Sequence, residues 1–238
     1  MTRQESRRTR PCAYCGGPLG ETDDHVIARQ FFPAENRYRS GLPQVPACPK
    51  CNGAKQRVED GPGVILQFGH SSDASMKLIL GRVRRTLAKN NRLRQSLRAS
   101  LRDTTLTQPD GFKVPGMVIT LSPRELADLW AWFRYVARGL YRFELGAVLP
   151  ADHTIHLVKP TSYKHFVVLR DLIFRVANRQ SREYAAGELR YAFARNDAEQ
   201  LTMWLLAFKS IEMFWLTVGP SSAAAVPPLL AGIEWTEP

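Results

Sequence analysis

The pattern of apolar and polar positions divides the chain into an N-terminal stretch without a long helical period and a longer, strongly patterned remainder. Residues 11–60 are rich in Gly and Pro, and "EDGPGV" at 59–64 predicts a turn at a domain boundary. We therefore expect a flexible basic tail at 1–10, a compact unit at 11–63 and a larger accessory region at 64–238.

Two helices are predicted in the accessory region. Leucine and valine recur at helical spacing over about 75–102, with Asn90 and Asn91 as an expected break. A second helix is expected over about 122–143, because Ser122, Pro123 and Glu125 form an N-terminal capping sequence ahead of a regular apolar period.

Strands are predicted around and after the second helix. "GFKVPGMVIT" (111–120) predicts an edge strand or a bulge, because its proline cannot donate to a ladder. Four later stretches are rich in β-branched and aromatic residues, which favours strands: "TIHLV", "FVVLRDLIF", "ELRYAFAR" and "MWLLAF" with "MFWLTV". The predicted class is α+β with a β-rich C-terminal portion, and Trp130, Trp132, Trp204 and Trp215 are expected in the core.

Composition and charge indicate what kind of partner the protein binds. The 238 residues are 44% hydrophobic and carry a net charge of +11. Residues 61–120 contain ten Lys/Arg against three Asp/Glu, and such a basic segment points to nucleic acid, with a merely solvated face as the alternative. No apolar run reaches the ~18 residues of a membrane span, and no signal peptide is evident. We expect a cytoplasmic protein without a membrane partner.

The four cysteines form two Cys-x-x-Cys pairs, Cys12/Cys15 and Cys48/Cys51. A tight turn within each pair can direct both thiolates at one ion, and four thiolates give the closed tetrahedral shell of structural zinc. Two disulfides or four free thiols are the alternatives, and an intracellular chain disfavours the disulfides. The 32 residues between the pairs exceed the needs of a minimal zinc ribbon, so a further element is expected there.

Asp24 and His25 lie between the cysteine pairs, and Asn52 directly follows the last cysteine. Binding of both pairs to one ion would carry these residues toward each other. Carboxylate and amide oxygens suit Mg²⁺ or Mn²⁺, and an imidazole can take a proton from water near neutral pH. The alternative is that Asp24 and His25 are ordinary polar loop residues.

The run Cys-x-x-Cys, Asp-His-Val-Ile, Val-Pro-Ala-Cys-x-x-Cys-Asn-x-x-Lys resembles the HNH endonucleases, which have a ββα-metal core. The resemblance covers residues 11–60. It implies that His25 is the general base, that Asp24 and Asn52 hold one divalent ion, and that the four cysteines hold a structural zinc. It also implies hydrolysis of DNA to a 3′-hydroxyl and a 5′-phosphate. The chain departs from the family's pattern at Pro43, where an Asn commonly orients the loop of the base, and at Ala28, where a Pro is usual.

Basic residues near these motifs are the expected contacts to phosphate, and double-stranded DNA is the expected partner. Lys55 lies one helical turn after Asn52 and is expected on the same helix face. The other candidates are Arg29, Arg57, Arg82, Arg85, Lys89 and Arg92. Two other functions remain open: a non-catalytic zinc module that binds nucleic acid, and a nuclease that acts on RNA.

Overall fold

The computed structural model describes residues 10–34, 41–68, 73–107, 111–158, 163–176, 178–198, 200–209 and 211–221. The predicted tail at 1–10, apart from Arg10, lies outside the described residues, as does the stretch 222–238. The described residues combine α-helices with antiparallel sheets, which agrees with the predicted α+β class. None of their helices has both the length and the apolar character needed to cross a bilayer.

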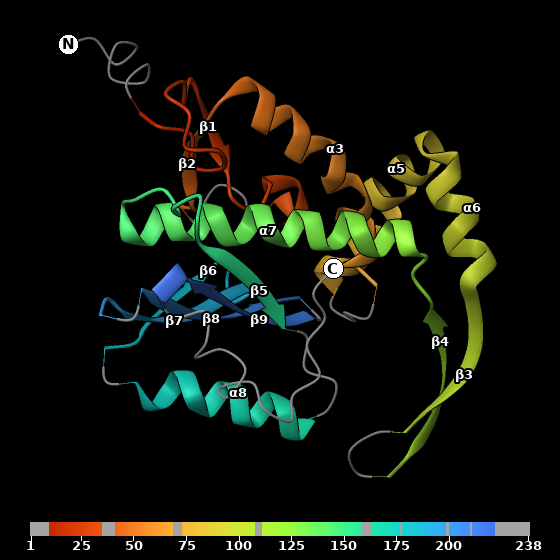
Figure 1. The fold of residues 1–238 in the computed structure, drawn as a ribbon. Coiled ribbons are helices and arrows are strands. Elements are labelled where there is room, and N and C mark those ends of the chain that lie inside the picture. Colours follow the sequence, from red (N-terminus) through yellow and green to blue (C-terminus); the bar gives the residue numbers. More distant parts are fainter. Residues whose placement is uncertain are drawn as a thin grey trace.

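The N-terminal unit is a β-hairpin followed by a long helix (Figure 1). Its elements are β1 (Thr22–His25), the short 3₁₀ helix η1 (Arg29–Phe31), β2 (Gln44–Ala47) and α3 (Pro49–Ile65). The antiparallel register pairs Asp24 with Val45 and His25 with Gln44. The hairpin thus fixes which neighbours the two motif residues have.

Helix α3 runs through the segment in which a turn was predicted at 59–64, so that prediction is wrong. Pro62 lacks the amide hydrogen of a helix interior, yet Val64 and Leu66 are buried and hold the helix end in place. Gly63 lets the ring of Phe31 approach within 3.5 Å of the point where a Cβ would lie. Packing therefore outweighs the local turn signal.

The predicted basic helix over 75–102 is several shorter elements. These are α4 (Asp73–Leu78), the π-helical η2 (Ile79–Val83), α5 (Arg84–Lys89) and α6 (Asn91–Ser100). The break at Asn90 is confirmed, and its side chain accepts a hydrogen bond from the amide of Leu93 at 3.0 Å. Leu93 and Leu97 pack with Val64, so α6 rests against the C-terminal end of α3.

The helix prediction is wrong at residues 101 and 102, where strand β3 (Leu101–Thr107) begins. Three threonines favour an extended backbone here, and β3 pairs along its whole length with β4 (Lys113–Ile119). The strand predicted around Pro115 is thus confirmed, and it lies in a two-stranded sheet.

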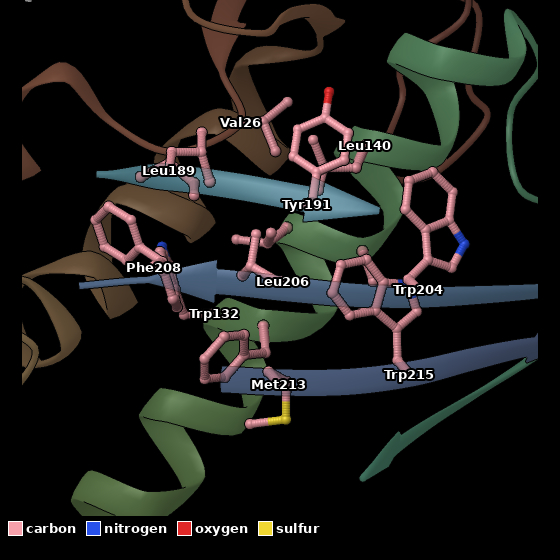
Figure 2. Close-up of a cluster of buried hydrophobic side chains, with 14 of the residues drawn as sticks. Val26, Trp132, Leu140, Leu189, Tyr191, Trp204, Leu206, Phe208, Met213 and Trp215 are labelled. Atoms are coloured by element: carbon pink, nitrogen blue, oxygen red, sulfur yellow. The ribbon is translucent and has the colours of Figure 1, made fainter. Parts of the chain in front are cut away.

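Helix α7 (Pro123–Leu145) passes between the N-terminal unit and the C-terminal sheet (Figure 1). The predicted capping box at Ser122 and Glu125 is present. The helix ends at Gly146, whose φ of +68° closes the last turn in the left-handed region. Figure 2 shows residues of α7 in one cluster with Val26 and with the sheet, so one core joins the two parts of the chain.

The C-terminal sheet has the strand order β5-β9-β8-β7-β6 and is antiparallel. Its strands are β5 (Thr154–Val158), β6 (Gln180–Tyr184), β7 (Leu189–Asn196), β8 (Leu201–Phe208) and β9 (Ile211–Val218). One face carries Trp204 and Trp215 toward α7, and these rings stack at 5.4 Å. The four tryptophans predicted for the core are all buried.

One predicted strand is a helix. "FVVLRDLIF" lies in α8 (Tyr163–Arg175), which covers the second face of the sheet (Figure 1). Leu169 and Ile173 are four residues apart and pack on Leu205 and Phe214. The helical spacing decided the structure, whereas the β-branched composition of the segment suggested a strand.

Gly139 of α7 packs against Val26, the residue after the end of β1. A Cβ at this position would lie 2.8 Å from Val26 Cγ1, one residue after His25. We expect Gly139→Ala to lower the free energy of unfolding by about 1 kcal/mol, because overpacking outweighs the better helix propensity of alanine. Urea unfolding measures this, with Ala127→Gly as a control for helix propensity alone; an increase in stability would contradict the packing argument.

Candidate metal centre and the neighbouring acid–imidazole site

The four cysteines converge on one point. Their sulfur atoms all lie within 4.8 Å of one another, and Cys15 Sγ is 4.0 Å from Cys48 Sγ. A zinc ion with four ~2.3 Å bonds to sulfur sets neighbouring sulfurs about 3.8 Å apart, so the cluster is close to that geometry. The thiols are positioned to bind a metal ion, and structural zinc fits them.

Each pair is held by local backbone structure. The first pair lies in a tight turn in which the Cys12 amide donates to Gly17 O at 2.8 Å and the Gly16 amide donates to Cys12 O at 2.9 Å. Gly16 has a φ of +73°, which a residue with a Cβ adopts only with strain. In the second pair, Cys48 is the N-cap of α3 and accepts a bond from the Cys51 amide.

Helix α7 packs against the turn that carries the first cysteine pair. Arg138 Nη1 donates to Tyr14 O at 3.0 Å, and the Tyr14 and Tyr135 rings meet edge to face at 5.1 Å. Tyr14 lies between Cys12 and Cys15 in the sequence, so this packing fixes the metal-binding turn on the shared core.

Asp24 points from β1 toward α3 and the cysteine turn. Its Oδ2 accepts a very short hydrogen bond from the Tyr14 hydroxyl and lies 3.1 Å from Lys55 Nζ. Burial raises the pKa of Tyr14 well above its usual value, and the Asp24 carboxylate raises it further, so the hydroxyl keeps its proton. Asp24 Oδ1 has no hydrogen bond within the part of the chain that the structure describes.

Lys55 is fully buried, with 0% of its side chain exposed. Its ammonium donates to Glu59 Oε1 at 2.6 Å and to His25 O at 2.8 Å, besides contacting Asp24. The expected contact of Lys55 with a phosphate therefore needs correction, because the amine has no accessible surface. Lys55 instead ties α3 to the end of β1.

Asn52 lies on the same side of β1 as Asp24. Its Nδ2 donates to Thr22 Oγ1 at 3.3 Å, and Thr22 shares a strand face with Asp24 by alternation. Asn52 Oδ1 accepts a bond from Gln56 at 3.2 Å and keeps a second lone pair. Asp24 and Asn52 thus each retain an oxygen that suits a hard divalent cation with water in its shell.

His25 lies on the other face of β1, beside Gln44. Its Nε2 accepts a bond from Arg29 Nε at 2.9 Å and lies 2.6 Å from Gln44 Nε2. Burial lowers the pKa of His25, and the Arg29 charge lowers it further, against the opposing effect of Asp24. The imidazole is therefore neutral at pH 7 and carries its lone pair on the nitrogen that faces Arg29.

Pro43, where the sequence departs from the HNH pattern, contributes through its backbone. Its carbonyl accepts a hydrogen bond from the amide of Val26 at 2.9 Å, directly after His25. Gln44, the next residue, contacts the imidazole itself. The loop of His25 is thus held without the side chain of an Asn.

The predicted basic residues divide into two groups. Arg29 is exposed beside His25, and Arg57 is exposed on α3. Arg85, Lys89 and Arg92 are exposed on α5 and α6, whereas Arg82 is half-buried on η2. The second group lies at the far end of α3 from the cysteines (Figure 1).

Sequence reasoning missed Tyr14 and Gln44 as residues of the site. The signal for Tyr14 was its place between two metal ligands, and that for Gln44 was its place opposite His25 in a hairpin.

A comparison of the chain with known protein families, with curated proteins and with solved structures finds no match.

Proposed function

We propose that this protein is a metal-dependent endonuclease of the HNH type that hydrolyses phosphodiester bonds in double-stranded DNA. One observation carries the proposal. An aspartate from β1 and an asparagine from the first turn of α3 lie on one side of a hairpin, directly beside a four-cysteine cluster and next to a neutral histidine. Hard oxygen ligands thus lie on one face of β1, with a proton acceptor in the next residue on the other face.

The position of the basic surface supports a duplex as the substrate. Asn52 and Val64 lie twelve residues apart on α3, which corresponds to about 18 Å at 1.5 Å per residue. Leu93 and Leu97 of the basic α6 pack at Val64. The spacing is roughly half of the 34–36 Å turn of B-DNA, so one duplex can reach both the site and the basic helices.

In this proposal Asp24 and Asn52 hold a Mg²⁺ or Mn²⁺ ion, and the four cysteines hold zinc that maintains the fold. The bound divalent ion would supply polarisation of the scissile phosphate and stabilisation of the leaving oxygen. Arg29 binds a phosphate oxygen and thereby leaves the His25 ring. Release of Gln44 as well as Arg29 from the ring leaves Nε2 of His25 able to accept the proton of the attacking water.

A second function, a non-catalytic zinc module that binds nucleic acid, is favoured by the partners of Asp24. One of its carboxylate oxygens already contacts a buried ammonium and a tyrosine hydroxyl. These contacts compete with a divalent ion for the same negative charge. In that case the basic helices still bind DNA, but the ion at Asp24 is absent or inert.

Replacing His25 with alanine is expected to reduce plasmid nicking in Mg²⁺ or Mn²⁺ at least a hundredfold, because general-base catalysis typically contributes about 10²–10⁴ in rate. His165→Ala on α8 is the matched control and is expected to nick like the wild type. A labelled RNA in the same assay tests the RNA alternative.

The two functions give different results in this assay. Nicking by the wild type that depends on the added metal and falls in His25→Ala supports the endonuclease. Equal behaviour of the wild type and His25→Ala, together with salt-dependent binding of the plasmid by both proteins, supports the non-catalytic module.

A further inference from the structure

The β3–β4 hairpin extends away from the rest of the molecule (Figure 1). Among the described residues it is a sheet of two strands, with the seven cross-strand pairs from Leu101↔Ile119 to Thr107↔Lys113. An isolated two-stranded hairpin is marginally stable in water, and stability normally needs a packed face. Ile119 packs against the buried cluster that contains Leu93 and Leu97, but most other residues of the two strands are exposed.

Exposed apolar side chains are concentrated on this hairpin. The described part of the chain contains twelve exposed large hydrophobic residues, and five of them lie here: Leu101, Leu106, Phe112, Met117 and Val118. Met117 is 65% exposed and Phe112 is 72% exposed. Leu101 and Met117 share one face of the hairpin, whereas Leu106 and Val118 lie on the other. Exposed apolar residues on a protruding element are typical of an interaction surface.

One face of the hairpin is open along its length. Directly opposite residues share a face, as do residues two apart, and this "open face" contains Leu101, Asp103, Thr105, Thr107, Lys113, Pro115, Met117 and Ile119. All of these residues except Ile119 are exposed. The open face is thus apolar at several positions and has two charged ones.

The two charges of the open face lie toward opposite ends of the hairpin. Asp103 is near its base and Lys113 is near its tip, about 14 Å apart along the strand direction. Neither side chain forms an ion pair with another described residue. If a second hairpin is turned end to end against the first, the acidic end of each hairpin therefore meets the basic end of the other.

We propose that the open face packs on the open face of a second copy of this chain, with the two hairpins antiparallel about a two-fold axis. With the axis at the Thr105–Pro115 pair, Asp103 of each copy lies beside Lys113 of the other copy. The same two-fold rotation buries Met117 and Pro115 of both copies in the interface. The interface is isologous, as in most symmetric dimers.

Charge favours a second copy over nucleic acid as the occupant. The described residues of the hairpin carry two cations, Arg102 and Lys113, and one anion, Asp103. A chain with a net charge of +11 repels its copy, and this nearly neutral surface adds little to that repulsion. The basic side chains of α5 and α6 lie outside the proposed interface and stay free for a polyanion.

Sedimentation velocity of the full-length protein, from low to high micromolar concentration, tests the proposal. The expected result is a dimer of twice the 26.9 kDa chain mass that dissociates on dilution. Asp103→Lys and Lys113→Asp are each expected to weaken the dimer about tenfold, because each places like charges opposite one another twice. The double exchange is expected to restore the dimer.

A second pair of variants separates the apolar contact from the charges. Met117→Ser combined with Leu101→Ser is expected to give a monomer with an unchanged far-UV spectrum, whereas the exposed control Val168→Ser stays dimeric. A wild type that is monomeric at every concentration would overturn the proposal. So would a dimer that none of the hairpin variants weakens, or hairpin variants that lower DNA affinity without changing the association state.

Discussion

Replacing Cys12 with serine is expected to abolish zinc binding and to unfold the N-terminal unit. Cys12 is fully buried, and its sulfur lies within 4.8 Å of the other three. Zinc adds on the order of 10 kcal/mol to the folding of small zinc domains, and a serine hydroxyl does not replace a thiolate ligand. Metal analysis of the purified protein and thermal melting by far-UV circular dichroism measure the two effects.

Removing the metal from the wild type provides the control. A strong chelator is expected to lower the melting temperature as the substitution does, and added zinc is expected to restore it only in the wild type. If Cys12→Ser were to retain one zinc per chain and melt like the wild type, the four-cysteine centre would not be a zinc site.

The effect is expected to reach beyond the zinc-binding unit, because the molecule has a shared core. Val26 of the N-terminal unit belongs to the same buried cluster as Trp132 of α7 and Phe208 of the sheet (Figure 2). Phe31 of the N-terminal unit belongs to this cluster as well. The Phe31 and Trp132 rings stack at 5.3 Å. Loss of zinc therefore removes one side of the packing around α7, and a single cooperative transition is expected to shift.

The features that sequence predicted well depend on residues close together in the chain. Ser122, Pro123 and Glu125 specify the start of α7 within one turn, and the structure contains that capping box. The two cysteine pairs each specify a turn, and both pairs meet at one point. Local chemistry is sufficient in these cases because no distant contact opposes it.

The errors arise where tertiary packing competes with a local signal. Gly61 and Pro62 favour a turn, but buried neighbours keep them in α3. The segment of α8 is rich in valine and isoleucine, but Leu169 and Ile173 at helical spacing match the second face of the sheet. In this segment the helical spacing of the buried residues was a better guide to the structure than the β-branched composition.

The candidate site shows the same limit. Spacing predicted that Asp24 and Asn52 belong together. In the structure Asp24 contacts Lys55 of α3, and Asn52, in the first turn of α3, contacts Thr22 on the same strand as Asp24. The burial of Lys55 could not be predicted, because it depends on contacts with Asp24 and with His25 O, thirty residues or more away in the chain. Its partner Glu59 is one turn further along, and a Lys–Glu pair at that spacing is usually an exposed surface pair.

Replacing Lys55 with methionine is the other substitution with a large expected effect. It would leave the carboxylates of Asp24 and Glu59 near each other without the buried ammonium between them. Removing one partner of a buried ion pair typically costs about 3–5 kcal/mol, so we expect a loss of that size in the free energy of unfolding. Urea unfolding measures it, with the exposed Lys50→Met on the same helix as the control, expected within about 0.5 kcal/mol of the wild type.

The pH dependence of this loss identifies its origin. Burial raises the pKa of Glu59 above 4.5 even though Lys55 opposes the shift, so removing Lys55 raises the pKa further. The folded variant then binds this proton more tightly than the unfolded chain does. The contribution of Glu59 to the stability of the variant is therefore greatest below the ordinary pKa of a glutamate. This contribution is lost as the pH rises through the raised pKa. The deficit against the wild type should therefore shrink toward pH 5, and Glu59→Met added to Lys55→Met should recover part of it at pH 7. A deficit that is constant with pH, or an equal loss in Lys50→Met, would show that the buried ion pair is not its cause.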